Sequence, residues 1–219
     1  MTILWKDDFN DPAEVVGNAP TKWIDFGGTI STTEAYSSPN SVYCSNTGPT
    51  GGTGIYQDFS GIVSSLGRMR YKQFKFSTDG TSYLNVYNID WMEIPLVITQ
   101  TSNSFVITDG AGTITLNSPT PALRKWYLFD IILHDTTYDI TITDMDDPTN
   151  VWTYNGASYA SGTKADLIWH AFVVTGGGTA FNPSTGTGYF DDVEFMTAPV
   201  LATTKIKGTT IKGTTIKGV

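Results

Sequence analysis

The chain has 219 residues, which is enough for one large β-sandwich or barrel with a sizeable core. Its net charge of -8 argues against nucleic acid as a partner, because a phosphate-binding surface needs clustered positive charge. A single cysteine, Cys44, excludes an internal disulfide, and its place in Ser41-Val-Tyr-Cys-Ser45 predicts a small core residue.

The first residues, Met-Thr-Ile-Leu-Trp-Lys-Asp-Asp, lack the basic start and apolar run of a signal peptide. No later apolar run is long enough to insert into a membrane. We therefore expect cytoplasmic synthesis followed by a place on a virion or extracellular particle. The alternative is a domain of a longer exported protein.

Short runs of alternating apolar and polar residues, separated by Gly, Ser, Thr and Asn, predict an all-β chain. There are too many runs for one sheet, so we expect two stacked antiparallel sheets. In chain order the predicted strands are Leu4-Phe9, Trp23-Phe26, Ser41-Ser45, Gly54-Phe59, Arg68-Phe76, Tyr83-Ile89, Leu96-Gln100, Ser104-Asp109, Thr113-Leu116, Trp126-His134, Asp139-Asp144, Leu167-Thr175 and Gly188-Phe195.

Turn-forming pairs that contain glycine separate several of these strands. The Asp-Gly pairs at 79–80 and 109–110 predict hairpins, and the Asn-Gly pair at 155–156 predicts a turn. Residues 62–66 can form a helical turn that connects two strands.

The opening and closing strands should pair, because an antiparallel sandwich usually brings its ends together and leaves no long open edge. That pairing would crowd four acids, Asp7, Asp8, Asp191 and Asp192. Such a cluster needs a cation, protonation or diverging side chains.

Residues 199–219 form a separate tail after a domain at 1–198. The tail repeats Thr-Thr-Ile-Lys-Gly and holds four lysines and no acid, so residues 1–198 carry -12. The opposite charges favour docking on an acidic surface, on this chain or on another copy or assembly protein; a flexible end is the alternative. The candidate assembly residues are Ile206, Ile211, Ile216, Lys207, Lys212 and Lys217.

Little in the sequence supports catalysis. A Ser or Cys nucleophile needs a base, and His134 and His170 both stand in strand contexts typical of structural histidines. In β-sandwich glycosidases two carboxylates tend to alternate on one strand, and we expect no strand to present such a pair. The chain is therefore predicted not to be an enzyme.

The candidate ligand-binding surface is the polar face of one strand. Leu84 and Val86 can face the core while Tyr83, Asn85 and Tyr87 face outward, and Trp91 follows at once. Aromatic rings beside amides suit a sugar. The alternative is that the tyrosines fit strand propensity or cover a second packed layer.

A second strand places Arg68, Arg70 and Lys72 on one face. They could hold an acidic sugar, but a solvated face explains them as well, and we favour that interpretation. Asp130, in a strand that is otherwise apolar, needs a partner.

Four motifs together resemble the jelly-roll carbohydrate-binding modules and the concanavalin A-like, laminin G-like sandwiches: Asp8-Phe-Asn10, Ser37-Ser-Pro-Asn-Ser-Val-Tyr43, Trp126-Tyr-Leu-Phe-Asp130 with Tyr138-Asp-Ile-Thr-Ile142, and Gly188-Tyr-Phe-Asp-Asp-Val-Glu-Phe195. The resemblance implies a two-sheet antiparallel jelly roll and a structural Ca²⁺ held by Asp8, Asn10, the Asn40 region and Asp191. The family usually has an acid where this chain has Asn10.

The leading hypothesis is a non-catalytic carbohydrate-binding domain displayed on a larger assembly such as a phage or virus particle. The competing hypothesis is a structural virion or surface-layer protein whose tail ties subunits together. A polysaccharide-cleaving enzyme is a third, for which the fold gives precedent.

Overall fold

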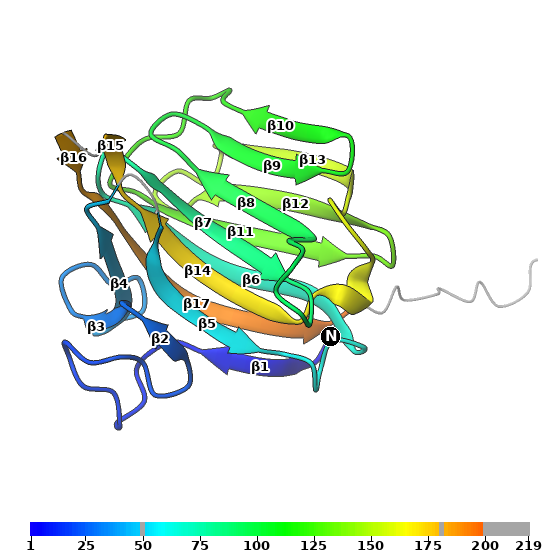
Figure 1. Ribbon diagram of the computed structural model, residues 1–219, viewed down its shortest axis with the longest axis horizontal. Coiled ribbons are helices and arrows are strands. Elements are labelled where there is room, and N and C mark those ends of the chain that lie inside the picture. Colours follow the sequence, from blue (N-terminus) through cyan, green and yellow to red (C-terminus); the bar gives the residue numbers. More distant parts are fainter. Residues whose placement is uncertain (49–50, 180–181, 199–219) are drawn as a thin grey trace, which may run out of the picture.

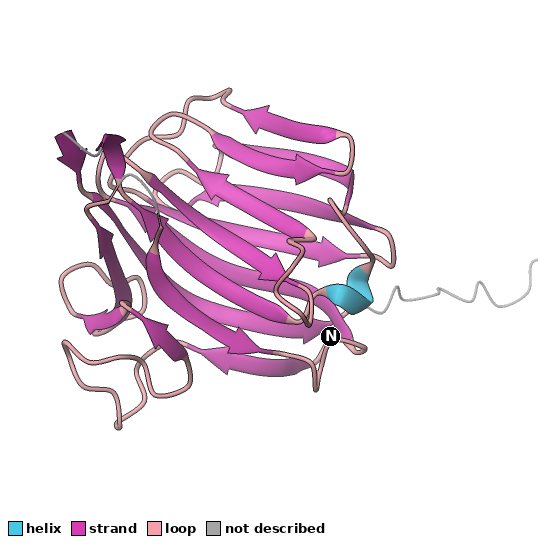
Figure 2. Ribbon diagram, in the orientation of Figure 1, coloured by secondary structure: helices cyan, strands magenta, loops and turns pink. Residues whose placement is uncertain are grey.

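The computed structural model describes residues 1–48, 51–179 and 182–198. Two antiparallel sheets of eight and seven strands lie face to face, one behind the other in Figure 1, and form the predicted jelly-roll sandwich. Figure 2 shows that strands dominate and that a short helix, η1 (Lys164–Asp166), lies between β13 and β14. Within the described ranges, no helix has the length and apolar character needed to cross a bilayer.

The eight-stranded sheet has the order β13-β12-β11-β6-β17-β4-β3, with β1 also paired to β17. Alternating burial along β6, β11 and β12 gives each strand a core face and an outer face. Its strands are β1 (Ile3–Asp7), β3 (Thr29–Ser31), β4 (Ser41–Asn46), β6 (Leu66–Lys75), β11 (Trp126–Leu133), β12 (Thr137–Asp144), β13 (Val151–Ser158) and β17 (Gly186–Thr197).

The seven-stranded sheet has the order β10-β9-β8-β7-β14-β5-β2. A separate two-stranded ribbon pairs β15 (Gly177–Thr179) with β16 (Asn182–Ser184). The strands of the seven-stranded sheet are β2 (Ile24–Phe26), β5 (Thr53–Asp58), β7 (Thr81–Tyr87), β8 (Leu96–Gln100), β9 (Phe105–Asp109), β10 (Gly112–Leu116) and β14 (Trp169–Thr175).

The core lies between the two sheets and is rich in aromatic rings. Tyr71 of β6 stacks on Phe129 of β11 with ring centroids 4.7 Å apart, and its ring also meets Phe172 of the opposite sheet at 4.9 Å. Such ring pairs add to the free energy of burial. Cys44 is fully buried, as predicted, and burial raises the pKa of its thiol well above the usual range.

The first and last strands pair as predicted. The second half of β17 pairs with β1, whereas its first half pairs with β4, and β6 runs along the other side of β17. The four acids at this junction have separate partners. Asp7 accepts from Trp23 Nε1 at 3.0 Å and pairs with Lys22, Asp8 pairs with Lys6, Asp192 pairs with Lys72, and Asp191 accepts from backbone amides.

Some turn predictions are wrong. Asp109-Gly110 does begin the β9–β10 hairpin, but Asp79-Gly80 lies where the chain crosses from β6 in one sheet to β7 in the other. Asn155-Gly156 lies inside β13, where Gly156 has φ 73° at a bulge opposite β12. Residues 59–66 form the predicted hydrogen-bonded turns, and the tail residues fall outside the described ranges.

Candidate functional site

The outer face of β7 carries three of the predicted ligand-binding residues. Leu84 and Val86 are buried in the core, so Tyr83, Asn85 and Tyr87 point away from it. Asn85 Nδ2 donates to the Tyr87 hydroxyl at 3.0 Å, and Asn85 is itself largely buried. Burial raises the pKa of Tyr83 to about 12, with a further contribution from the Tyr87 phenol. This face is therefore a packed polar layer with Tyr87 at its end.

The loop after β7 folds back and sets Trp91 against that face. Asn88 organises the loop, since its backbone carbonyl accepts from the Trp91 amide at 3.2 Å and its side-chain oxygen accepts from the Met92 and Glu93 amides. Trp91 adopts φ 59°, a region that residues other than glycine seldom occupy. The result is a Trp91 ring centred 4.8 Å from the Tyr87 ring and still 40% exposed.

Neighbouring strands complete an aromatic surface around Trp91. Its ring lies 4.9 Å from that of Trp169 on β14 and 5.2 Å from that of Tyr56 on β5. The rings of Trp91 and Tyr56 border an open hollow of about 350 Å³, which we call the aromatic hollow, and Trp169 packs behind Trp91. Its lining residues are Phe26, Tyr56, Tyr87, Trp91 and Ala171.

Of the four predicted residues, Tyr87 and Trp91 line the aromatic hollow. Asn85 lies next to it, opposite Ala171, whereas Tyr83 lies further along β7, opposite Val173. Sequence reasoning missed Tyr56, Phe26 and Trp169. Tyr56 could have been found, because it follows the core residue Ile55 in β5 and alternation therefore points its side chain outward. Among the residues that the structure describes, no charged side chain lines the hollow, so it suits a neutral ligand with apolar surface and hydroxyl groups.

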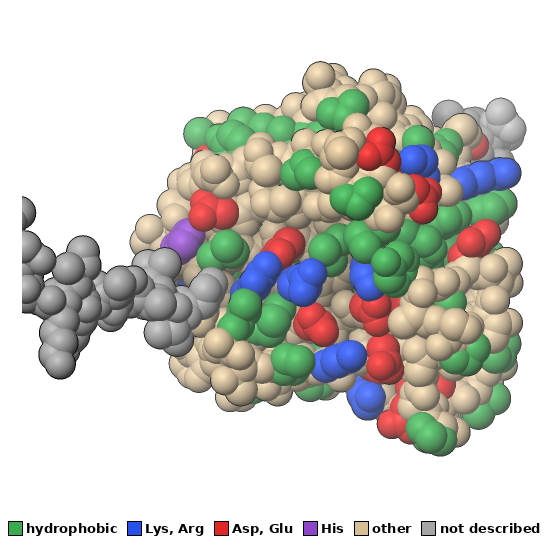
Figure 3. All heavy atoms as spheres, turned by 180° about the vertical axis from the view of Figure 1, so that it is seen from behind, with side chains coloured by type: hydrophobic (Ala, Val, Ile, Leu, Met, Phe, Trp, Pro, Cys, Tyr) green, Lys and Arg blue, Asp and Glu red, His purple; other side chains and the backbone are tan. Residues whose placement is uncertain are grey.

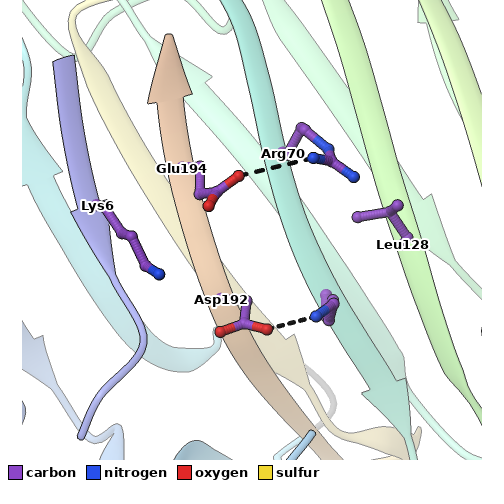
Figure 4. Close-up of a pocket in the computed structure, with 6 residues that line it drawn as sticks. Lys6, Arg70, Leu128, Asp192 and Glu194 are labelled. Carbon is purple, nitrogen blue, oxygen red and sulfur yellow. Dashed lines mark hydrogen bonds and ion pairs between the residues drawn. The ribbon is translucent and has the colours of Figure 1, made fainter. Parts of the chain in front are cut away.

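A second hollow lies on the opposite sheet. Basic and acidic side chains stand side by side over the middle of the eight-stranded sheet (Figure 3). They border a cavity of about 150 Å³, which we call the charged cleft, shown in Figure 4. It is lined by Lys6 of β1, Arg70 and Lys72 of β6, Leu128 of β11, and Asp192 and Glu194 of β17.

Arg68, Arg70 and Lys72 of β6 share this outer face, as predicted, but the face is not simply solvated. Arg68 Nε bonds to Asp130 at 2.6 Å, which supplies the partner that Asp130 needs, and Lys72 bonds to Asp192. Arg70 makes longer ion pairs, 3.6 Å to Asp130 and 3.7 Å to Glu194. Lys72 also lies 3.5 Å above the Tyr36 ring.

Asp192 and Glu194 overturn one expectation. They are two carboxylates, separated by one residue of a strand, that line the same cavity (Figure 4). A bulge between Asp191 and Glu194, with Asp192 at φ 47°, places them there. In the structure each faces a cation of β6.

The histidines have the expected structural environments. His170 is fully buried, its Nε2 lies 3.1 Å from the Leu167 carbonyl oxygen, and its ring packs edge-on against Phe59 and Phe195. Burial lowers the pKa of His170 to about 4. His134 pairs with Asp139 at 2.9 Å.

The residues that the resemblance assigns to Ca²⁺ do lie together. Asn10 Nδ2 donates to the Asp8 and Ser37 carbonyl oxygens at 2.8 and 3.1 Å, and Asn10 Oδ1 accepts from the Asn40 amide at 3.0 Å. Asp191 accepts from Ser37 Oγ and from the Tyr36 and Ser37 amides.

As arranged, these residues do not fit a calcium ion. The Asn10 amide nitrogen lies among the carbonyl oxygens that a cation would need, and the Asn40 amide holds Asn10 in that orientation. Among the described residues, no three His, Cys, Asp or Glu side chains group in a way that could hold a metal ion. Calcium binding here requires the Asn10 side-chain oxygen, instead of its nitrogen, to face the Asp8 and Ser37 carbonyl oxygens. The calcium site stays a prediction.

No protein-family model and no curated protein sequence matches the chain. Solved structures do match its fold. An alginate lyase from Aplysia kurodai has a TM-score of 0.60 at 14% identity over 90% of this chain and 100% of that one. A GH131 beta-glucanase catalytic domain from Podospora anserina has a TM-score of 0.58 at 12% identity over 91% and 98%.

A third match is the CBM2 module of the evolved Dit of Lactobacillus casei BL23 phage J-1, with a TM-score of 0.51 at 15% identity over 91% of this chain and 96% of that one. At these identities the similarity shows the fold. The chain therefore has the jelly-roll sandwich found in carbohydrate-active and carbohydrate-binding proteins. That fold serves both enzymes and binding modules.

Proposed function

We propose that this chain is a carbohydrate-binding domain that takes a neutral saccharide in the aromatic hollow. The observation that carries the proposal is Trp91, which stays 40% exposed while it packs against Tyr87, Trp169 and Tyr56. A loop in a strained conformation holds this ring in place.

The chemistry of the hollow supports a sugar. One face of a pyranose ring is apolar and can stack on the Trp91 or Tyr87 ring, while the hydroxyls of Tyr56 and Tyr87 can exchange hydrogen bonds with sugar hydroxyls. The small side chain of Ala171 leaves room at the floor. The solved structures with this fold include an alginate lyase, a beta-glucanase catalytic domain and a CBM2 module. Their names support a saccharide as the class of ligand.

The test is binding to a panel of neutral polysaccharides by glycan array, followed by calorimetry on the best ligand. Trp91→Ala and Tyr87→Ala should each weaken binding at least tenfold, about 1.4 kcal/mol. Phe76→Ala is the matched control, because Phe76 is an exposed aromatic residue outside the hollow. Wild-type protein that binds no neutral glycan would reject the proposal.

We further propose that the domain is displayed on a larger assembly through residues 199–219. The opposite charges of the tail and of residues 1–198 support this, as does the likeness to a module of a phage Dit. In the alternative, a structural virion or surface-layer protein, the tail also ties subunits together, but the domain binds no glycan. Deletion of 199–219 should reduce the particle mass measured by light scattering, and an unchanged mass would count against both.

A further inference from the structure

Arg70 stands in the charged cleft without the hydrogen bonds that an arginine usually makes. Within the described ranges its five N–H donors meet only two carboxylates, at 3.6 and 3.7 Å, which are ion-pair contacts beyond hydrogen-bond length. Its Nε is buried and has no hydrogen-bond partner among the described residues. The Arg70 side chain is still 34% exposed, so its two terminal nitrogens, rather than the buried Nε, have unused capacity to bind an anion through two parallel hydrogen bonds.

Two of the three nearby carboxylates do not use this capacity, because each is bonded to another cation. Asp130 is bonded to Arg68 at 2.6 Å, and Asp192 is bonded to Lys72. Glu194 is the one acid of the cleft whose described ion pair is with Arg70, and that pair is long. The long ion pairs with Asp130 and Glu194 therefore hold Arg70 in position and leave its N–H groups free to donate hydrogen bonds.

A second cation faces the same cavity. Lys6 reaches into it from β1 (Figure 4), and its described ion pair, to Asp8 at 3.7 Å, joins two side chains that are each about half exposed. Such exposed pairs contribute little free energy and exchange easily. The cleft lining holds three cations against two carboxylates, which leaves +1 on a domain that carries -12. This local sign favours an anionic ligand.

We propose that the charged cleft binds the carboxylate of an acidic sugar, a uronic acid residue within a polysaccharide. Arg70 would take the carboxylate as a bidentate pair, and Lys6 would add a second positive charge. Leu128 supplies an apolar wall for the C–H face of the ring. The site is on the opposite sheet from the aromatic hollow, so it is independent of the proposed function.

A sugar fits this surface better than an acidic peptide. Lys72, at the edge of the cleft, lies over the Tyr36 ring, and Tyr36 meets Trp126 with ring centroids 6.2 Å apart. Tyr36 is 42% exposed, so the aromatic surface continues beyond the cations. A chain of sugar rings could follow this path from charge to aromatic contact.

The experiment is calorimetric titration of full-length protein with oligogalacturonate and with the same oligomer reduced at its carboxyl groups. Wild type should bind the acid form at least tenfold more tightly. Arg70→Gln should lose at least tenfold in affinity, and Arg70→Lys should recover little of it, because an ammonium cannot form the bidentate pair. Arg124→Gln is the control: Arg124 lies over the Phe76 ring and does not line the cleft, so this variant should stay within twofold of wild type.

The comparison of the two oligomers on wild type needs no variant and so does not depend on the folding of Arg70→Gln. Equal affinity for both oligomers, or full affinity in a folded Arg70→Gln, would overturn the proposal. Equal affinity for a polyglutamate peptide would overturn the assignment to a sugar. Trp91→Ala should leave oligogalacturonate affinity within twofold, which separates this site from the aromatic hollow.

Discussion

The ring centroids of Trp91 and Tyr87 lie 4.8 Å apart, and this contact depends on Asn88, a residue of the loop between them. Asn88 ties the loop through both its backbone and its side chain. The aromatic hollow is thus formed by a strand and by a short loop that one amide organises.

Substituting Asn88→Ala should therefore weaken glycan binding without unfolding the sandwich. Two backbone amides lose their acceptor, and Trp91 is no longer held in its left-handed conformation. We expect a five- to tenfold loss of affinity by calorimetry, about 1 kcal/mol, with a small change in Tm. Asn103→Ala, in another loop, is the control; equal losses in both variants would contradict a specific role for Asn88.

Acid should destabilise the fold through His170. Its folded pKa is about 4, below the ordinary value of 6.5, so between these pH values the unfolded chain binds the proton more strongly. Stability is therefore retained above pH 6.5 and falls as the pH drops toward 4, by about 3 kcal/mol in the limit. The physical reason is that burial disfavours the charged imidazolium in the folded protein.

Urea unfolding of wild type and His170→Gln from pH 7 to pH 4 checks this. The difference between the two should shrink as the pH falls, because the variant lacks the titrating group. Asp191, whose pKa burial raises to about 6, acts in the opposite direction over part of this range, but both proteins contain it. A difference that stays constant with pH would contradict the prediction.

Calcium can be tested at Asn10. Asn10→Asp replaces an amide that donates to the Asp8 and Ser37 carbonyl oxygens with a carboxylate that repels them. In chelator the variant should have a lower Tm than wild type, and added Ca²⁺ should raise the Tm of the variant more than that of wild type. Asn18→Asp is a surface control. No response to Ca²⁺ in either protein would remove the calcium prediction.

The predicted lack of catalysis is also open to measurement. Incubation with neutral and acidic polysaccharides should release no reducing ends and no unsaturated products, whose ultraviolet absorbance is easily followed. If products do appear, Asp192→Asn and Glu194→Gln identify the source, because both carboxylates line the charged cleft. Activity lost in both variants would make the domain an enzyme.

Alternation along single strands predicted which side chains share a face. Tyr83, Asn85 and Tyr87 point outward because Leu84 and Val86 are buried, and the same rule placed Arg68, Arg70 and Lys72 together. The period of two that a strand imposes makes such predictions possible from sequence. Their roles in binding remain predictions.

Register between distant strands could not be predicted. Trp169 pairs across the sheet with Tyr87, and Tyr56 pairs with Ala171, so the aromatic hollow depends on contacts between residues far apart in sequence. Local backbone exceptions, such as the left-handed conformation of Trp91, were equally hidden. The carboxylate pair of the charged cleft was not hidden: Asp192 and Glu194 alternate with the buried Val193 and Phe195, so the sequence places both on one face, and the expectation that no strand presents such a pair was wrong.

The position of β17 has a consequence for how the protein is made. β17 lies between β6 on one side and β4 and β1 on the other, so until residues 186–197 arrive the eight-stranded sheet is divided into three parts: β13-β12-β11-β6, β4-β3, and β1. During synthesis the edges of β6 and β4 remain unpaired, and open edges invite pairing with other chains. Completion of the sheet therefore has to wait until β17 has left the ribosome, and aggregation during expression should depend on that delay.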